Sequence, residues 1–197
     1  MKKSKKWMIV LAIILVPVIG LGFNYFSWHG EKDTSKQALT VDGGITVQEI
    51  AAEKNIVPGD KICDAVGFNI KSTAPSFLRV KVESSYSNDG NSENTTSANI
   101  YEIKQVKDNW IKGNDGYYYY TKAVDKNSQS SVPFVDSIYF TVEAGEDVDA
   151  NQYQDKYIHA KVTAEMIQAK YGVFEDAWGI HSGDVYDKLK EESDKIN

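Results

Sequence analysis

Residues 55–84 read NIVPGDKICDAVGFNIKSTAPSFLRVKVES, and the pattern of apolar residues in this stretch indicates the class of fold. Apolar and polar residues alternate in two runs, and turn-forming residues separate the runs. In the second run, Leu78, Val80 and Val82 share one face, and charged residues occupy the other. A period of two residues is typical of a half-buried β-strand whose apolar side faces a core. The stretch therefore predicts two neighbouring strands.

The first run in this stretch places its apolar residues on one face of a single strand, with Asp64 as the exception. These residues are Ile62, Val66, Phe68 and Ile70. The same alternation recurs further along the chain, in Ile138–Val142 and Ile158–Val162. Short alternating runs at such spacing are typical of an all-β sandwich. We therefore expect an all-β fold.

The loops between these strands are also marked in the sequence. Residues 84–97, SSYSNDGNSENTTS, are polar apart from Tyr86, which predicts an exposed loop. Asn114, Asp115 and Gly116 give the strongest hairpin signal in the chain. The strand after that turn contains Tyr117–Tyr120, with two tyrosines on each face. Packing in a half-buried strand is favoured over ligand stacking for these rings.

The C-terminal part is less strongly patterned. Residues 164–171 are good helix formers, yet they directly continue the strand that ends at Thr163, so both structures remain open. From Ser182 onward, a capping residue and apolar residues at helical spacing predict a short acidic helix. We expect three parts: residues 1–26 as a signal peptide or membrane anchor, 27–181 as the β-sandwich domain, and 182–197 as a C-terminal tail or short helix.

The N-terminus resembles an export signal. Four lysines, Lys2, Lys3, Lys5 and Lys6, precede residues 7–26, which contain no charged side chain. A helix of that length would span roughly 30 Å, so it would just cross the hydrocarbon core of a bilayer. The sequence thus predicts a secreted protein if the leader is cleaved, or one anchored by residues 7–26 if it is retained. A buried core helix is disfavoured because no face of the run is polar. In either export case the positive-inside rule places the rest of the chain outside the cell.

The charge of the chain is unevenly distributed. Its net charge is −6, but removing the four leader lysines leaves 18 basic and 28 acidic side chains, a net charge of −10. One arginine, Arg79, is present. This acidic body disfavours nucleic acid as a partner, because phosphates would be repelled.

Common catalytic motifs are absent from the sequence, and we predict no catalytic, cofactor-binding or metal-binding residue and no cofactor. The three histidines, His29, His159 and His181, are scattered, and His159 falls on the outward side of its strand, which predicts an exposed or interface residue. Cys63 is the one cysteine, so it cannot form an intramolecular disulfide; a small packed or surface thiol is expected, with an intermolecular disulfide as the second interpretation.

One fragment is similar to the start of a calcium-binding loop. Asp147, Asp149 and Asn151 occur at every second position. Gln152 stands where glycine makes the turn, and Ile158 stands where a bidentate glutamate is needed. A solvated acidic loop is therefore the favoured interpretation.

Several motifs, in order, resemble the exported proteins processed by the SipW signal peptidase, the TasA and camelysin group of Gram-positive bacteria. In residues 55–84, a Pro-Gly-Asp turn leads a strand, and the next strand is an Arg-Val-Lys-Val run. Trp110 followed by Asp115–Tyr120 is similar to the W-x-x-x-x-D-G-Y-Y-Y-Y motif of the family. Residues 161–169, KVTAEMIQA, are similar to its A-E-A-I-Q-A strand, followed by Ala177 and Trp178. The likeness is greatest to the BsaA-type biofilm matrix proteins of clostridia, over most of residues 40–178.

This resemblance implies a jelly-roll-like antiparallel β-sandwich on the surface of a Gram-positive cell. In TasA-like members, an N-terminal strand of one subunit completes a sheet of the next, and here that strand would lie between Phe23 and Ile50. The implied partners are a signal peptidase during export, then further copies or related matrix subunits. The family leader ends near A-Y-F-S/T-D, where this chain has Asn24, Tyr25, Phe26, Ser27 and Trp28.

Three functions follow as expectations. The first is a non-enzymatic matrix or surface-fibre subunit that assembles by strand donation. The second is a membrane-tethered extracellular module that binds a ligand or glycan through exposed aromatic residues such as the tyrosine run. The third is a camelysin-like metalloprotease, which the scattered histidines disfavour.

Overall fold

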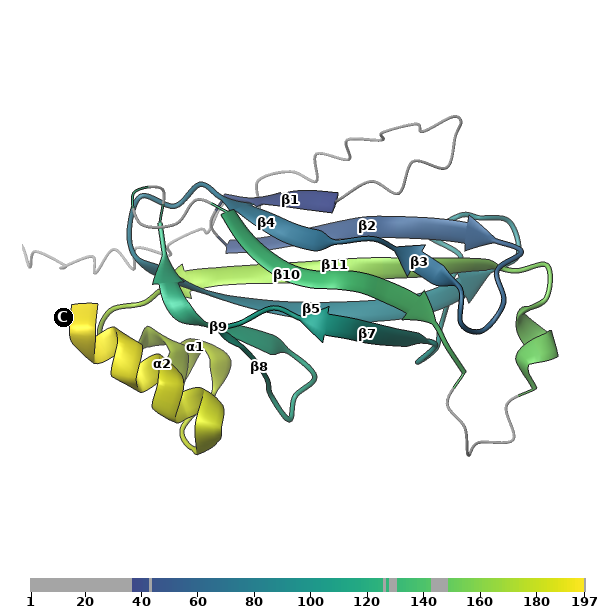
Figure 1. Cartoon of the computed structure of the whole chain (residues 1–197). Helices are drawn as coiled ribbons and strands as arrows, with labels where there is room; N and C mark the ends of the chain where they lie inside the picture. Colours follow the sequence, from purple (N-terminus) through teal and green to yellow (C-terminus); the bar gives the residue numbers. More distant parts are fainter. Residues whose placement is uncertain (1–36, 43, 126, 128–130, 143–148, 197) are drawn as a thin grey trace, which may run out of the picture. The chain divides into compact units, whose positions relative to one another are not determined.

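The computed structural model describes residues 37–42, 44–125, 127, 131–142 and 149–196, all of which belong to one structural unit. They form two β-sheets that pack face to face, followed by two helices near the C-terminus (Figure 1). The expected all-β, sandwich-like fold is therefore confirmed. The predicted leader, residues 1–26, lies outside the described residues. In the part of the chain that the structure covers, neither α-helix has the length and apolar character needed to cross a bilayer.

The first sheet, sheet A, is built around a long central strand. Its members are β1 (Gln37–Val41), β3 (Lys61–Cys63), β4 (Val66–Ile70), β7 (Tyr101–Val106) and β10 (Ser131–Phe140). The first half of β10 pairs with β4, and its second half pairs with β3 and β7. β1 pairs with β4 in parallel, whereas every other described pair is antiparallel. The expected antiparallel sandwich thus contains one parallel edge.

The second sheet, sheet B, has its two longest strands side by side in the middle. Its members are β2 (Gly44–Lys54), β5 (Ser76–Ser87), β6 (Thr96–Ser97), β8 (Trp110–Lys112), β9 (Tyr118–Val124) and β11 (Tyr157–Gln168). The order is β2-β11-β5-β9-β8, and β6 pairs with the end of β5. β5 and β11 pair over twelve residues each. The predicted hairpin at residues 114–116 joins β8 to β9.

The main core lies between the sheets. The alternation that predicted it is confirmed, because Leu78, Val80 and Val82 on β5 are at most 2% exposed. Phe68 and Phe134 from sheet A pack against Trp110 from sheet B. The apolar face of each sheet is thereby covered by the other.

A second core covers one end of the outer face of sheet B. The helices α1 (Val173–Trp178) and α2 (Gly183–Ile196) contribute Phe174 and Leu189 to it. These side chains pack against Phe77 of β5 and Tyr119 of β9. The predicted C-terminal helix is confirmed, and it is a packed part of the fold. Residues 164–168, whose type the sequence left open, continue β11.

The predicted single strand over Ile62–Ile70 is wrong, because the structure divides it into β3 and β4. The break falls at Asp64, the residue that interrupted the apolar face. A carboxylate cannot enter an apolar core without a partner. The chain turns there instead, and the Asp64 carboxylate pairs with the Lys61 ammonium at 2.7 Å.

The predicted loop over residues 84–97 begins too early. β5 continues to Ser87, and Ser84 and Ser87 are 7% and 3% exposed. Ser84 Oγ donates a hydrogen bond to the Ala98 carbonyl and accepts one from the Ile100 amide. Hydropathy misses such a strand end because its stabilising groups are hydroxyls.

Candidate functional site

The strand β1 is the first candidate, because it is short and lies at an edge of sheet A. It pairs with β4 from Gln37↔Val66 to Val41↔Ile70. The side chains of Leu39 and Val41 are 0% exposed, whereas Thr40 between them is exposed. Among the described strands, β4 is its one hydrogen-bonded neighbour. Two buried side chains and one row of backbone bonds therefore hold β1.

The strand β2 is an edge strand of a different kind. It is eleven residues long and pairs with β11 along one side. Ile45 and Val47 point away from the core, with exposed fractions of 68% and 54%. A long edge strand with apolar side chains and unpaired backbone groups is a template for a further strand. Among the described strands, β1 thus lies at an edge of sheet A and β2 at an edge of sheet B.

The sequence predicts an exposed or interface position for His159, but this residue is 2% exposed. His159 does lie on the outward face of β11. There, its Nε2 is 2.8 Å from Ser87 Oγ, and its Nδ1 is 2.5 Å from the Glu49 carboxylate of β2. The prediction is wrong because the polar end of β5 covers the ring. The ring links β2 to the two central strands of sheet B.

Ser87, His159 and Glu49 have the order of contacts found in a serine hydrolase triad, in which a carboxylate orients a histidine and the histidine contacts a hydroxyl. Catalysis also needs room for a substrate carbon beside the hydroxyl. Ser87 is 3% exposed, and its Oγ accepts a hydrogen bond from the Gly90 amide at 3.1 Å. With Ser87 buried, the hydrogen bonds among these three groups connect β2 and the end of β5 to β11.

Arg79 is the centre of a cluster on the outer face of sheet B. Its guanidinium donates two hydrogen bonds to Glu165 Oε2, from Nε at 2.8 Å and from Nη2 at 2.6 Å. Its Cζ lies 4.1 Å from the ring centroid of Tyr117 and 4.9 Å from that of Trp178. The cluster therefore ties the hairpin strand and helix α1 to β5 and β11.

This cluster also shifts the titration of its members. Burial raises the pKa of Tyr119, and the hydrogen bond from its hydroxyl to Asp115 raises that pKa further. Burial and a hydrogen bond to Glu165 raise the pKa of Tyr117 in the same way. Burial alone would lower the pKa of Arg79, but the contacts with Tyr119 and Glu165 raise it. The arginine is therefore charged and both tyrosines are neutral at physiological pH.

The interpretation of the tyrosine run as packing is confirmed. Tyr118 and Tyr120 belong to the core between the sheets, and Tyr119 belongs to the second core. Tyr117 is half-buried against Arg79. The run does not present a row of free rings for a ligand.

The remaining residues considered in the sequence have local roles. Cys63 is packed, at 7% exposure, and its thiol lies 3.2 Å from the Asp64 carbonyl. The Asp149 carboxylate accepts a hydrogen bond from the Asn151 amide and caps the short 3-10 helix η1 (Ala150–Tyr153). Asp147 and His29 lie outside the described residues, and His181 is exposed. Within the described ranges, three or more His, Cys, Asp or Glu side chains nowhere gather as metal ligands would.

Comparison with known proteins gives no family. No family model matches the chain, and no curated protein matches it. Among solved structures, it is similar to PliG from Aeromonas hydrophila, a periplasmic inhibitor of g-type lysozyme, at 8% identity and a TM-score of 0.26; the match covers 68% of this chain and all of that one. It is also similar to the pre-peptidase C-terminal domain of a Bacillus anthracis collagenase, at 8% identity and a TM-score of 0.21, over 69% of this chain and all of that one. Neither value assigns this chain to a family with those proteins.

Proposed function

We propose that the chain is an exported structural protein of the Gram-positive cell surface, a subunit of a biofilm matrix or surface fibre that assembles by strand donation. The observation that carries the proposal is β1. It is a short parallel edge strand whose Leu39 and Val41 fill the sheet edge beside β4. The ordered motifs shared with the TasA and camelysin group support the same function, including a jelly-roll-like topology.

Strand donation requires that the slot beside β4 accept the same segment from another copy. A neighbouring β1 would make the same backbone bonds and bury the same two side chains, so the exchange costs little within the slot. The region first considered for the donated strand, residues 23–50, includes most of β2, which pairs with β11. We therefore assign donation to the part of that region that ends with β1.

The proposed route to the surface begins with residues 1–26. A signal peptidase would recognise this leader, and cleavage would release a subunit that can donate its N-terminal part. If residues 7–26 are retained, the same domain is tethered to the membrane. N-terminal sequencing of protein recovered from the cell surface distinguishes the two forms, because an intact Met1 identifies the anchor and a start near Phe23 identifies the released subunit.

Two variants in β1 test strand donation. Protein beginning at Phe23 should form fibres that are visible by electron microscopy and sediment on centrifugation. Leu39→Lys should stop assembly, because an ammonium cannot occupy a fully buried apolar site. Thr40→Lys is the matched control, since its side chain is exposed, and it should assemble. Deleting residues 23–50 is a poorer test, because that deletion also removes most of β2.

A complementation experiment separates donation from simple loss of folding. A peptide with the sequence of residues 36–42, KQALTVD, should bind the Leu39→Lys protein, whose slot lacks a fitting strand. Circular dichroism checks that the variant retains its sheets. Assembly of Leu39→Lys at the rate of the unsubstituted protein would exclude β1 as the donated strand. Monomers under all conditions for both Thr40→Lys and the unsubstituted chain would exclude fibre formation.

We propose no enzymatic activity for this chain. The camelysin-like alternative requires a bound metal, so zinc content distinguishes the two. Purified protein should contain far less than one zinc ion per chain by elemental analysis. Stoichiometric zinc would contradict the proposal and would favour the metalloprotease alternative.

A further inference from the structure

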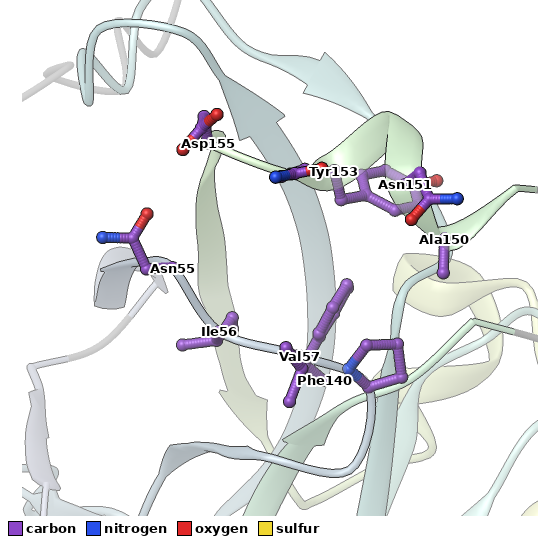
Figure 2. A pocket seen from close by; sticks show the side chains of 10 residues that line it. Asn55, Ile56, Val57, Phe140, Ala150, Asn151, Tyr153 and Asp155 are labelled. Carbon is purple, nitrogen blue, oxygen red and sulfur yellow. The ribbon is translucent and has the colours of Figure 1, made fainter.

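A cavity lies where the chain leaves β2, beside the helix η1 (Figure 2). Its volume is about 360 Å³, within the range of roughly 300–1,000 Å³ that is typical of small-molecule sites. One wall is the segment 55–58, and the opposite wall consists of residues 150–155. Neither segment belongs to the sheet edges used in the proposed assembly.

The two walls differ in chemistry. Figure 2 shows Ile56 and Val57 on one side of the opening, and Val57 is 60% exposed. Asn151 and Asp155 lie on the opposite side, and the carboxamide and carboxylate residues that line the cavity are exposed. An apolar surface therefore faces a row of groups that form hydrogen bonds.

The polar groups of the cavity are available to a ligand. Asn55, Asn151 and Gln154 contribute three carboxamides, and Asp155 contributes one carboxylate. In the described part of the chain, these four head groups make no hydrogen bond with another residue. A carboxamide both donates and accepts hydrogen bonds, as a hydroxyl does. The set therefore matches a ligand rich in hydroxyl groups.

The two segments that line the cavity are fixed by hydrogen bonds and ring packing in the absence of a ligand. The turn after Val57 is closed by hydrogen bonds in both directions between Val57 and Asp60. The Gly59 amide donates to the Phe140 carbonyl at 2.8 Å, which fixes this turn to β10. On the other wall, the Tyr153 ring meets the Phe140 ring edge to face, with centroids 5.8 Å apart. A preformed site loses less free energy on binding than one that must be ordered.

Charge narrows the class of ligand. Among the described residues, no lysine or arginine lines the cavity, and Asp155 is the one charged residue in its lining. A phosphate, sulfate or carboxylate ligand would therefore be repelled, since nothing in the lining compensates its charge. A peptide strand is also disfavoured, because it binds by pairing with a free strand edge. The walls here are a turn and a 3-10 helix.

We propose that this cavity binds a neutral sugar residue of an oligosaccharide. The C–H face of a pyranose ring would lie on Val57 and Pro58, and its hydroxyl groups would bond with Asn151 and Gln154. Such a site would attach the protein to a surface or matrix glycan. The inference goes beyond strand donation and does not depend on it, because the two use different residues.

Chemical-shift titration of the purified chain tests the site. The probes are neutral tetrasaccharides of N-acetylglucosamine, of β-linked glucose and of α-linked glucose, with a sulfated oligosaccharide as the anionic probe. At least one neutral probe should shift the amide signals of residues 55–58 and 150–155, and the sulfated probe should not. The double variant Asn151→Ala, Gln154→Ala should weaken that binding by about tenfold or more, since each lost hydrogen bond costs roughly 1 kcal/mol.

Two controls make the result specific. Gln168→Ala removes an exposed carboxamide of β11, outside the cavity, and should leave binding unchanged. Asp155→Asn keeps an acceptor but removes the charge, so neutral sugar binding should change by less than about threefold. Loss of neutral sugar binding in Asp155→Asn would show that the Asp155 carboxylate carries the binding and would overturn the roles assigned to Asn151 and Gln154. Absence of binding for all three neutral probes, or binding that the double variant leaves unchanged, would overturn the proposal.

Discussion

Arg79 lies on the outer face of β5, where the alternation of the strand alone would predict a solvated cation. Instead, its side chain and that of Glu165 are each 13% exposed and bonded to one another. Removing one member of a fully buried pair costs roughly 3–5 kcal/mol, because the other charge is left without a partner. The residual exposure here reduces this to about 2 kcal/mol for Arg79→Ala, measured as the free energy of unfolding in urea. Lys81→Ala is the control, since the Lys81–Glu83 pair is exposed and should change stability by less than about 0.5 kcal/mol.

Tyr119 predicts how stability depends on alkaline pH. Its pKa is raised above the ordinary value of 10.0 in the folded state. The folded state therefore keeps the proton at a pH where the unfolded state releases it. This contribution to stability is complete below about pH 10 and is lost as the pH rises toward the folded pKa.

The unfolding free energy should accordingly fall between pH 9 and 11, and Tyr119→Phe should reduce the slope of that fall by up to about 1.4 kcal/mol per pH unit. Tyr171→Phe is the control, because Tyr171 is 79% exposed, and it should keep the slope of the unsubstituted protein. An equal slope in both variants would show that Tyr119 does not cause the alkaline loss.

For single residues, the sequence predicts the burial of apolar side chains well and the burial of polar side chains poorly. The burial of Leu78, Val80 and Val82 follows from alternation, because moving apolar surface out of water into the core is favourable. The burial of Ser87 and His159 does not follow from alternation. It depends on partners 72 and 110 positions away in the chain, which hydropathy cannot identify.

The strand β2 contributes Ile50 to the core between the sheets, but its other large apolar side chains are exposed. Ile45 and Val47 face away from the core, so the backbone bonds of β2 to β11 and the Glu49–His159 contact supplement the packing of Ile50. His159→Ala removes that contact and also one of the two hydrogen-bond partners of the buried Ser87 Oγ, leaving the Gly90 amide as the other. We expect a loss of about 1–3 kcal/mol in unfolding free energy.

Hydrogen exchange would locate the effect of His159→Ala. The amides of β2 should exchange faster in the variant, whereas those of β9 should change only by the global loss of stability. Gln48→Ala, an exposed neighbour on β2, serves as the control and should leave exchange unaltered. Uniform acceleration across both strands would show that His159 stabilises the whole sheet and does not act through β2.

At the element scale, the strands with an inward apolar face were predictable, and the edge strands were not. β5 shows the expected alternation from Leu78 to Ser84, and β11 shows it from Ala160 to Ile167. In β2, Ile45 and Val47 face outward while Ile50 is buried in the core, so the strand lacks the regular alternation from which the other strands were predicted. The cavity lies between two segments that are about 100 positions apart in the sequence, 55–58 and 150–155. The pairing of β2 with β11, and the contacts of both walls with Phe140 at the end of β10, bring them together.

At the scale of the whole molecule, charge opposes the proposed assembly. A chain beginning at Phe23 carries all 28 acidic side chains and 18 basic ones, a net charge of −10. Copies that pack along a fibre would repel each other, and salt screens that repulsion. The screening length falls from about 30 Å at 0.01 M salt to about 8 Å at 0.15 M. Fibres should therefore form faster at 0.15 M sodium chloride than at 0.01 M, as followed by light scattering.

Salt alone also promotes nonspecific aggregation, so the β1 variants are needed to interpret this dependence. Leu39→Lys should remain unassembled at both salt concentrations, because screening does not repair an unfilled apolar slot. Thr40→Lys adds a positive charge to an exposed position and should depend less on salt than the unsubstituted chain. If Leu39→Lys scatters light as strongly as the unsubstituted protein at 0.15 M, the scattering comes from aggregation. If salt leaves the rate unchanged for all three proteins, repulsion between acidic bodies does not limit assembly, and exchange of β1 between its own slot and that of a neighbour becomes the limiting step.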